Sequence, residues 1–187
     1  MECNEDIFLL KQFHFNIEKL TAALEEACDK IGYSGGAVNC ISLTKMPGDH
    51  QEDPRGIYWT KPTSSGVEVQ REGHVDESKY TEFEPRLIDG YFYDVYSELC
   101  RHYKIGRVRI LKLNQRSTLS WHRDPEPRIH IPIVTNPGAI MVIDNFATHM
   151  PADGSAYFTN TRNYHVAFNG GEEARVHIVA TVLEACV

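Results

Sequence analysis

The amino-acid sequence predicts a mainly β protein with flanking helices. In the second half of the chain, apolar and polar residues alternate with a period of two, which is typical of strands with one buried face. The first half carries two segments with the apolar spacing of amphipathic helices. The length of 187 residues favours a single domain over residues 1–187. We expect residues 1–106 to supply helices and a covering segment, and residues 107–187 to supply the β core.

The first helix is predicted over residues 17–31. Asn16 is a suitable N-cap, because its short side chain can accept a hydrogen bond from the first turn, and Gly32 is a suitable stop. The apolar stripe of this helix consists of Ile17, Leu20, Leu24, Ala27 and Ile31. The second helix is predicted over residues 86–103, with Gly106 beyond its end. Its apolar face consists of Leu87, Tyr91, Val95 and Leu99.

A polar stretch from Pro47 to Phe83 lies between the two predicted helices. It is rich in glycine, proline, serine and charged residues, and this composition predicts loops with short strands. A connection of this length is unusual in a compact domain unless it has a function. We therefore expect it to cover the functional site, although nothing in residues 40–105 indicates which side chains contact a substrate.

The alternating pattern predicts a series of strands in the second half of the chain. They cover residues 107–114, 127–134, 139–144, 155–159, 164–169 and 174–183. Between Arg128 and Ile133 every second residue is isoleucine, and the other positions include a cation and an imidazole. Arg175 and His177 share one side of a later strand in the same way. Each of these strands therefore has one apolar face and one face equipped for chemistry.

The last two strands are predicted to form a hairpin around Gly170-Gly171. Only a loop of odd length would then place His165, Arg175 and His177 on one face, because a shift of one residue reverses every side chain. The opposite, apolar faces need cover, which the two predicted helices can provide. These faces consist of Ile129, Ile131, Val166, Phe168, Val176 and Ile178.

His122 and Asp124 carry the strongest chemical signal. In an extended chain, residues i and i+2 point the same way, so both side chains can reach one metal ion. With the distant His165 they make the ligand set of a 2-His-1-carboxylate iron site, which leaves positions open for substrate and oxygen. The His-x-Asp pair alone is weak evidence, because it also arises as a loop histidine beside a solvated aspartate.

Several segments from about Arg107 to the C-terminus together resemble the aspartyl/asparaginyl β-hydroxylase family of Fe(II)- and 2-oxoglutarate-dependent oxygenases. They are Trp121–Asp124, Arg128–Pro132, His165–Asn169 and Arg175–His177, and they occur in the family's order. The resemblance implies a jelly-roll barrel, the cupin-like double-stranded β-helix, with the N-terminal helices packed on it. Some members of the family lack the metal-binding carboxylate, whereas this chain keeps Asp124.

The resemblance also assigns site residues. The implied Fe(II) ligands are His122, Asp124 and His165. The implied 2-oxoglutarate residues are Arg175, which lies ten positions after His165 as in the family, His130 and Arg128. Arginine suits this task because its planar fork meets a carboxylate with two parallel hydrogen bonds. The competing interpretations are a packing role for His130 or His177 and a salt bridge from Arg175 to Glu172 or Glu173. No catalytic residue is implied beyond the metal ligands.

The implied activity is the hydroxylation of an aliphatic C–H bond in an amino acid or amino-acid residue, with Asp/Asn-type β-hydroxylation favoured. O2 is consumed, and 2-oxoglutarate is converted to succinate and carbon dioxide. Two alternatives remain. A metal-dependent cupin hydrolase or isomerase would use the same ligands without 2-oxoglutarate, and would need no role for Arg175. A non-catalytic metal-binding module would not need a complete ligand set.

Composition excludes several other classes. A net charge of −7 argues against a general nucleic-acid binder. The five cysteines are widely spaced and form no Cys-x-x-Cys motif, so they predict reduced thiols and not disulfides or a zinc site. The N-terminus is acidic, and no apolar run is long enough for a signal peptide or a membrane span. We expect a cytoplasmic enzyme with an amino-acid or peptide substrate and no nucleic-acid or membrane partner. Ordinary packing or surface roles are expected for His14, His50, His74, His102, His149, Trp59 and Trp121.

Overall fold

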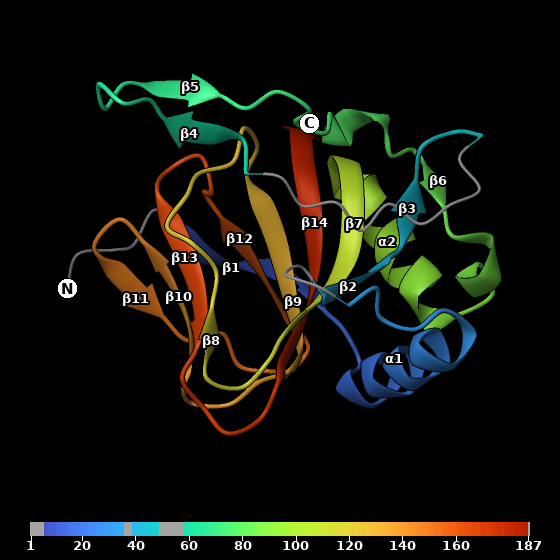
Figure 1. Cartoon of the computed structure of the whole chain (residues 1–187). Coiled ribbons are helices and arrows are strands. Elements are labelled where there is room, and N and C mark those ends of the chain that lie inside the picture. Colours follow the sequence, from blue (N-terminus) through green and yellow to red (C-terminus); the bar gives the residue numbers. More distant parts are fainter. Residues whose placement is uncertain (1–5, 36–38, 49–57, 187) are drawn as a thin grey trace.

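The structure, a computed structural model, describes residues 6–35, 39–48 and 58–186 (Figure 1). Two antiparallel sheets face each other, and the two α-helices pack on the outer side of the larger sheet. The order in the larger sheet is β1 (Ile7–His14), β12 (Ser155–Thr159), β9 (Arg128–Val134), β14 (Arg175–Ala185), β7 (Tyr103–Leu113) and β2 (Asn39–Ser42). The order in the smaller sheet is β11 (Phe146–Thr148), β10 (Ala139–Ile143), β13 (His165–Asn169) and β8 (Ser117–Thr118).

The predicted mainly β class with helices is therefore confirmed. Each of the strands predicted from alternation is present, because apolar residues at every second position bury one face of the sheet. β7 begins earlier than predicted, at Tyr103, so Gly106 lies inside a strand and not after a helix. None of the helices in the described ranges has the length and apolar content needed to cross a bilayer.

Helix α1 (Ile17–Lys30) begins and ends where the sequence predicts. The Asn16 side chain accepts a hydrogen bond from the Lys19 amide, and Gly32 has a φ of 80° that favours glycine. Helix α2 (Tyr91–His102) begins later than predicted, after Gly90 at its N-cap. Leu87 belongs instead to a separate 3-10 turn, η2 (Pro85–Leu87), although its side chain is still buried.

The larger core lies between the helices and the larger sheet. Leu20 of α1 and Leu99 of α2 belong to the same buried cluster as strand residues of β9 and β14. These strand residues are Ile129, Ile131, Val176 and Ile178, so the predicted helical cover is confirmed for them. It is wrong for Val166 and Phe168, which are only partly buried. They alternate on β13 with side chains that face the larger sheet, whereas the helices pack on the other side of that sheet.

The predicted hairpin between the last two strands is wrong. β13 pairs with β10 and β8, whereas β14 pairs with β7 and β9, so the loop over residues 170–174 crosses from one sheet to the other. This loop passes close to Gly138: a Cβ added at Gly138 would lie only 2.6 Å from the Gly171 amide nitrogen, and a Cβ added at Gly171 would meet the Asn136 side chain. His165 and Arg175 therefore come together because their sheets face each other, and not through hairpin parity.

The polar stretch between the helices contains short elements near one end of the sheets. They are β3 (Thr44–Lys45) with β6 (Glu82–Phe83), β4 (Thr60–Pro62) with β5 (Glu68–Gln70), and the 3-10 turn η1 (Glu77–Lys79). The short strands expected in this stretch are thus confirmed where it is described, and residues 49–57 lie outside the described residues. Gly106 of β7 allows η1 to approach, because a Cβ there would lie 2.6 Å from the Glu77 carbonyl oxygen.

Candidate active site

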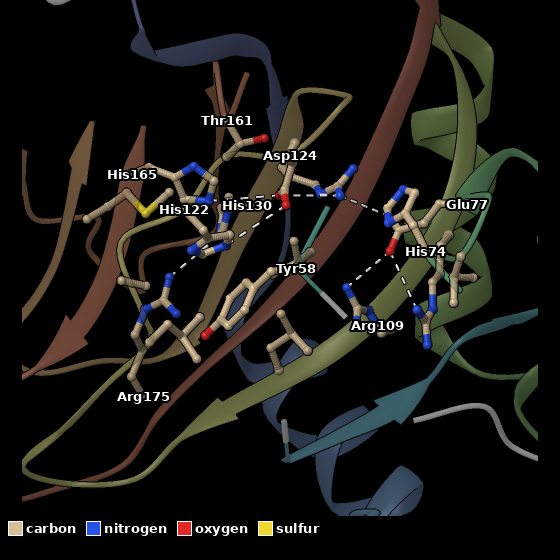
Figure 2. A pocket seen from close by; sticks show the side chains of 18 residues that line it. Tyr58, His74, Glu77, Arg109, His122, Asp124, His130, Thr161, His165 and Arg175 are labelled. Carbon is tan, nitrogen blue, oxygen red and sulfur yellow. Dashed lines mark hydrogen bonds and ion pairs between the residues drawn. The ribbon is translucent and has the colours of Figure 1, made fainter. Parts of the chain in front are cut away.

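A cavity of about 120 Å³ opens between the two sheets (Figure 2). The larger sheet contributes charged side chains from β7, β9 and β14, including Arg109, Arg128 and Arg175. The smaller sheet contributes His165 and apolar neighbours from β10 and β13. The predicted metal ligands and the predicted cosubstrate residues therefore line one cavity.

His122, Asp124 and His165 are held side by side by the backbone. The His122 amide donates to the His165 carbonyl at 3.1 Å, and the His165 amide donates back to the His122 carbonyl at 2.7 Å. The Asp124 amide donates to the Thr161 carbonyl at 2.8 Å. One ligand atom from each of the three side chains lies within 4.8 Å of the others. The loop after β8 is thus clamped to the start of β13, which brings a local motif against a residue far away in sequence.

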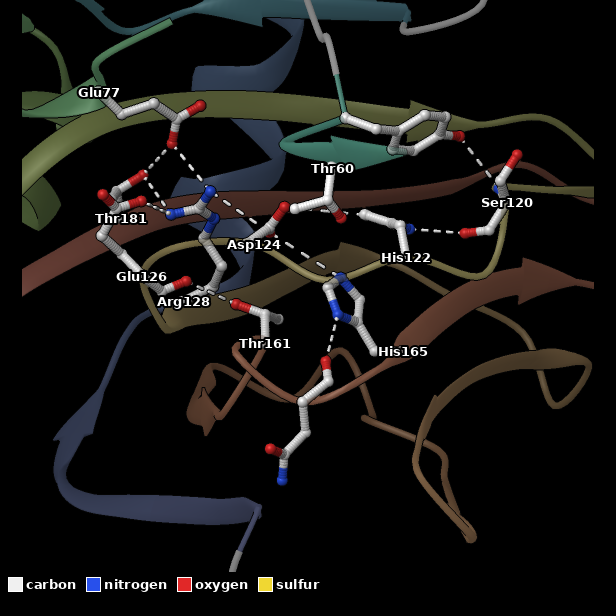
Figure 3. Close-up of polar contacts among 12 residues, drawn as sticks. Thr60, Glu77, Ser120, His122, Asp124, Glu126, Arg128, Thr161, His165 and Thr181 are labelled. Atoms are coloured by element: carbon white, nitrogen blue, oxygen red, sulfur yellow. Dashed lines mark hydrogen bonds and ion pairs between the residues drawn. The ribbon is translucent and has the colours of Figure 1, made fainter. Parts of the chain in front are cut away.

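The hydrogen bonds of the two histidines determine which ring nitrogen faces the cluster. Nδ1 of His122 lies 2.6 Å from the Ser120 carbonyl, and Nδ1 of His165 lies 3.1 Å from the Asn163 carbonyl (Figure 3). A carbonyl oxygen can only accept, so each Nδ1 carries a proton, and in the neutral form of the ring Nε2 keeps a lone pair. Burial lowers the pKa of His165 to about 4, against the opposing effect of Asp124, so this ring is neutral near pH 7.

Both Nε2 atoms point toward the same carboxylate. Nε2 of His122 lies 3.9 Å from one oxygen of Asp124, and Nε2 of His165 lies 3.9 Å from the other. With the protons on Nδ1, all three groups are acceptors and none can donate to another. Two imidazole nitrogens and a carboxylate oxygen are also the donor set that suits Fe(II) with open positions. The residues present therefore fit a divalent metal ion.

Arg128 holds the carboxylate of this cluster. Its NH2 group lies 3.3 Å from Asp124 and 3.0 Å from Glu77, and its NH1 group donates to Thr181 at 2.9 Å (Figure 3). Burial lowers the pKa of Arg128, but Glu77, Asp124 and Glu126 more than offset this effect and leave it above the ordinary value. The donors of Arg128 thus already serve protein carboxylates, which is a different environment from the one that the resemblance implies.

Glu77 is the buried anion of a cluster of arginines. Its carboxylate lies 3.5 Å from Arg107, 3.4 Å from Arg109 and 3.0 Å from Arg128, and it accepts from Thr181 at 2.5 Å. Burial alone would raise the pKa of Glu77, but the three guanidinium groups lower it to about 2. η1 therefore supplies a permanent negative charge that links β7, β9 and β14.

Arg175 has a different environment. It is buried, and its NH2 group donates to Nδ1 of His177 at 2.9 Å and to Nδ1 of His130 at 3.5 Å. Burial, reinforced by the charge of Arg175, holds the pKa of both histidines well below the ordinary value. Each neutral ring therefore keeps its proton on Nε2, and His130 adds an N–H donor on the cavity wall.

No carboxylate pairs with Arg175 among the residues that the structure describes. Glu172, one of the two alternative partners, is exposed and instead forms a 2.5 Å ion pair with Arg116. Burial lowers the pKa of Arg175 to about 10, so the side chain still carries its charge near pH 7. A buried, charged guanidinium beside two neutral imidazoles is unfavourable unless an anion binds there.

The β4–β5 hairpin and the residues before it contact the loop that carries the metal-ligand candidates. The Tyr58 ring lies 4.6 Å from the His122 ring, and the Ser120 amide donates to the Tyr58 hydroxyl at 3.1 Å. Arg123, between the two candidates, forms a 2.6 Å ion pair with Glu68 and lies over the ring of Trp59. Tyr58 also lines the cavity, so this part of the polar stretch lies beside the metal-ligand loop.

Several cavity residues were not predicted from the sequence. They are Tyr58, His74, Glu77, Arg107 and Arg109. The alternation of Arg107 and Arg109 on a predicted strand was an available signal, because both must share a face. His74 was expected to be an ordinary residue but lines the cavity. Trp121, expected to pack, is half exposed and stacks on Tyr164.

A family model described as aspartyl/asparaginyl beta-hydroxylase matches residues 93–184, the part of the chain that contains the cluster and Arg175. Over these 92 of the 187 residues the chain is similar to this family. It is therefore an enzyme of the class of 2-oxoglutarate- and Fe(II)-dependent oxygenases, with a His-Asp-His cluster at its centre. A search of curated proteins finds no match.

Two solved structures share the fold of this chain. A 2OG-Fe(II) oxygenase family oxidoreductase from Burkholderia pseudomallei has 13% sequence identity and a TM-score of 0.53, over 97% of this chain and 93% of that chain. A viral collagen prolyl hydroxylase from Paramecium Bursaria Chlorella virus-1, solved with 2OG, has 10% identity and a TM-score of 0.53, over 98% of both chains. At these identities the two structures support the fold alone.

We predict that Glu77 makes the protein sensitive to acid. Its folded pKa of about 2 lies below the unfolded value of about 4.3, so its stabilising effect is complete above about pH 4.3 and is lost as the pH falls toward 2. The full contribution of Glu77 to the free energy of unfolding is about 3 kcal/mol, and about 2 kcal/mol of it is lost between pH 5 and pH 3. Urea unfolding should show Glu77→Gln to be less stable at pH 7 and less dependent on pH over this range.

The control is Glu172→Gln, which removes an exposed carboxylate paired with an exposed arginine and should leave the dependence of stability on pH unchanged. A Glu77→Gln protein that loses as much stability as the wild type between pH 5 and pH 3 would contradict the prediction.

Proposed function

We propose that the protein uses Fe(II), 2-oxoglutarate and O2 to hydroxylate an aliphatic C–H bond of an amino acid or an amino-acid residue. The observation that carries the proposal is the pairing of two features in one cavity. One is a cluster of three acceptors without a proton among them, and the other is a buried arginine without a described carboxylate partner. We also assign the two facing sheets to the double-stranded β-helix that the family uses.

In this proposal His122, Asp124 and His165 hold the metal ion. Both imidazoles are oriented by Nδ1–H bonds to backbone carbonyls, so their lone pairs need no rearrangement before binding. Arg128 fixes the carboxylate from the other side. When bound, Fe(II) supplies the open positions at which 2-oxoglutarate and O2 react.

Arg175 binds the distal carboxylate of 2-oxoglutarate, and His130 assists it as a neutral donor. This role gives the buried charge of Arg175 the counter-ion that it lacks among the described residues. It also favours the oxygenase over a cupin hydrolase or isomerase, which would leave Arg175 without a purpose. For Arg128, the contacts with Glu77 and Asp124 support the positioning of Asp124 and not a cosubstrate role.

The substrate class follows from the family, whose name describes β-hydroxylation of aspartyl and asparaginyl groups. Tyr58 and the β4–β5 hairpin cover the metal-ligand loop, and we assign them the task of keeping water from the reacting C–H bond.

We predict that Fe(II) and 2-oxoglutarate, added together without oxygen, give a weak visible charge-transfer band. His165→Ala should abolish the band and weaken Fe(II) binding by more than the roughly 10- to 100-fold that loss of a supporting partner costs. Asp124→Ala should weaken binding less, because water can take the place of the carboxylate. The exposed His14→Ala is the matched control. A band that survives in His165→Ala would place the metal elsewhere.

We predict that Arg175→Met raises the dissociation constant of 2-oxoglutarate by about 100-fold or more, because a bidentate charge-assisted pair is lost. Fe(II) binding should stay nearly unchanged, since Arg175 does not contact the three acceptors. Anaerobic titration of the band measures both, with the exposed Arg116→Met as control. If the dependence on 2-oxoglutarate did not change, another cation would bind its distal carboxylate, and Arg128 would be tested first.

We predict that succinate release is slow with 2-oxoglutarate alone and accelerates when the correct substrate is added, because closure of the site accompanies substrate binding. Free amino acids and short peptides that contain Asp, Asn or Pro form the screening panel. The amino-acid assignment fails if none of these compounds accelerates turnover while a metabolite of another class does. The cofactor assignment is measured separately by the charge-transfer band.

A further inference from the structure

A second arginine faces the cavity at a distance from Arg175. Arg109 and Arg175 both line the cavity, and they lie on opposite sides of Tyr58 in Figure 2. In the register of the larger sheet, Arg175 lies opposite Leu113, whereas Arg109 lies opposite Val179. The four-residue step from Arg109 to Leu113 on β7 corresponds to about 13 Å along the strand. Among the arginines that line the cavity, Arg109 and Arg175 therefore occupy separate positions.

Arg109 lies in one row with other cavity residues. Val179 of β14 is opposite Arg109 on one side and opposite His130 on the other, and all three line the cavity. Directly opposed residues on neighbouring strands share a face, and two strand spacings correspond to about 10 Å. Arg109 thus lies two strands across the sheet from His130, and it is linked to Asp124 of the metal cluster only through Glu77 and Arg128.

The guanidinium of Arg109 has fewer partners within the protein than those of Arg107 and Arg128. Its closest ionic contact is with the Glu77 carboxylate, at 3.4 Å. Arg107 and Arg128 contact the same carboxylate, so Arg109 shares its single charge with them. Arg128 also has the Asp124 carboxylate and the Thr181 hydroxyl, and Arg107 is almost fully buried over the Tyr80 ring. The side chain of Arg109 is 11% exposed, more than those of the other two arginines.

We propose that Arg109 binds a carboxylate of the substrate. This inference rests on the proposed function, and it narrows the substrate to an amino acid that brings a free carboxylate into the cavity. The α-carboxylate of a free amino acid and the side chain of an aspartyl residue in a polypeptide both offer this chemistry. 2-Oxoglutarate does not fill this position in the proposed arrangement, because one end of it binds the metal and the other end binds Arg175.

The shape and charge of the position fit this ligand. A planar fork with donors available meets a carboxylate with two parallel hydrogen bonds. Three guanidinium groups share Glu77, and Asp124 and Glu126 contact only Arg128 among them, so the described contacts balance the positive charge of Arg109 only in part. An uncharged amide at the same place would leave the rest of this charge unbalanced, so the site should distinguish acids from amides.

The test compares matched acids and amides. The free pairs are L-proline with L-prolinamide and L-aspartate with L-aspartic acid α-amide, and the peptide pair is N-acetyl-Ala-Asp-Ala-amide with its Asn counterpart. Binding is measured without turnover, from the shift that each compound causes in the Fe(II)–2-oxoglutarate band under anaerobic conditions. KM is then measured for each compound that binds. The wild-type protein should bind the acid about 100-fold more tightly than its amide, either among the free amino acids or among the peptides. The set that shows this preference identifies whether the substrate is a free amino acid or a residue in a polypeptide.

Arg109→Gln should reduce affinity for the preferred acid by about 100-fold while changing affinity for its amide by less than threefold. Arg109→Lys keeps the charge and should recover part of the loss. Arg116→Gln removes an exposed arginine outside the cavity and should behave as the wild type. The dissociation constant of 2-oxoglutarate, titrated in parallel, separates a substrate effect from a cosubstrate effect.

The proposal is overturned if the preferred substrate carries no carboxylate, or if Arg109→Gln binds the preferred acid as tightly as the wild type. If Arg109→Gln does not fold, Arg109→Lys and the acid–amide pairs on wild-type protein still decide the question. Failure of the proposed function would appear differently, as the absence of the band in wild-type protein. In that case calorimetry with the same pairs tests the carboxylate position by itself.

Discussion

The site depends on three hydrogen-bond acceptors that converge where none of them has a proton to give. Such an arrangement is unfavourable by itself, so the surrounding backbone has to maintain it. Reciprocal amide–carbonyl bonds join His122 to His165, and carbonyls of neighbouring residues fix the orientation of both rings. Arg128 then holds Asp124 in place. The ligand geometry is therefore prepared by protein contacts, which reduces the reorganisation needed when a metal binds.

The arginines of the cavity divide into two kinds according to their counter-ions. Arg107 and Arg128 are buried with Glu77, whose charge is retained because three cations surround it. These arginines belong to the structure of the site, and removal of Glu77 would leave several buried charges unpaired. Arg175 is equally buried but has neutral imidazoles for neighbours. Its unbalanced charge marks a ligand-binding position more clearly than the identity of the residue does.

The features predictable from the sequence are those with a local cause. His122, Asp124, His165 and Arg175 were recognisable from spacing, and the strands were recognisable from their alternation. The connection after β13 was not, because Gly170-Gly171 is compatible both with a hairpin and with the close approach to Gly138 that the fold uses. Glu77 was hidden for a similar reason. Only the tertiary contact between η1 and β7 reveals that this residue, in a polar stretch, is buried.

The two remaining cationic positions differ in burial. Arg175 is fully enclosed, so an anion that pairs with it must be completely desolvated and held by the neutral donors around it. Arg109 keeps part of its surface exposed, on the other side of Tyr58. In the proposed function, a cosubstrate bound at Arg175 would therefore be buried more deeply than a second anion at Arg109. This difference agrees with the proposed function, in which 2-oxoglutarate would bind at the deeper position and the substrate would close the cavity.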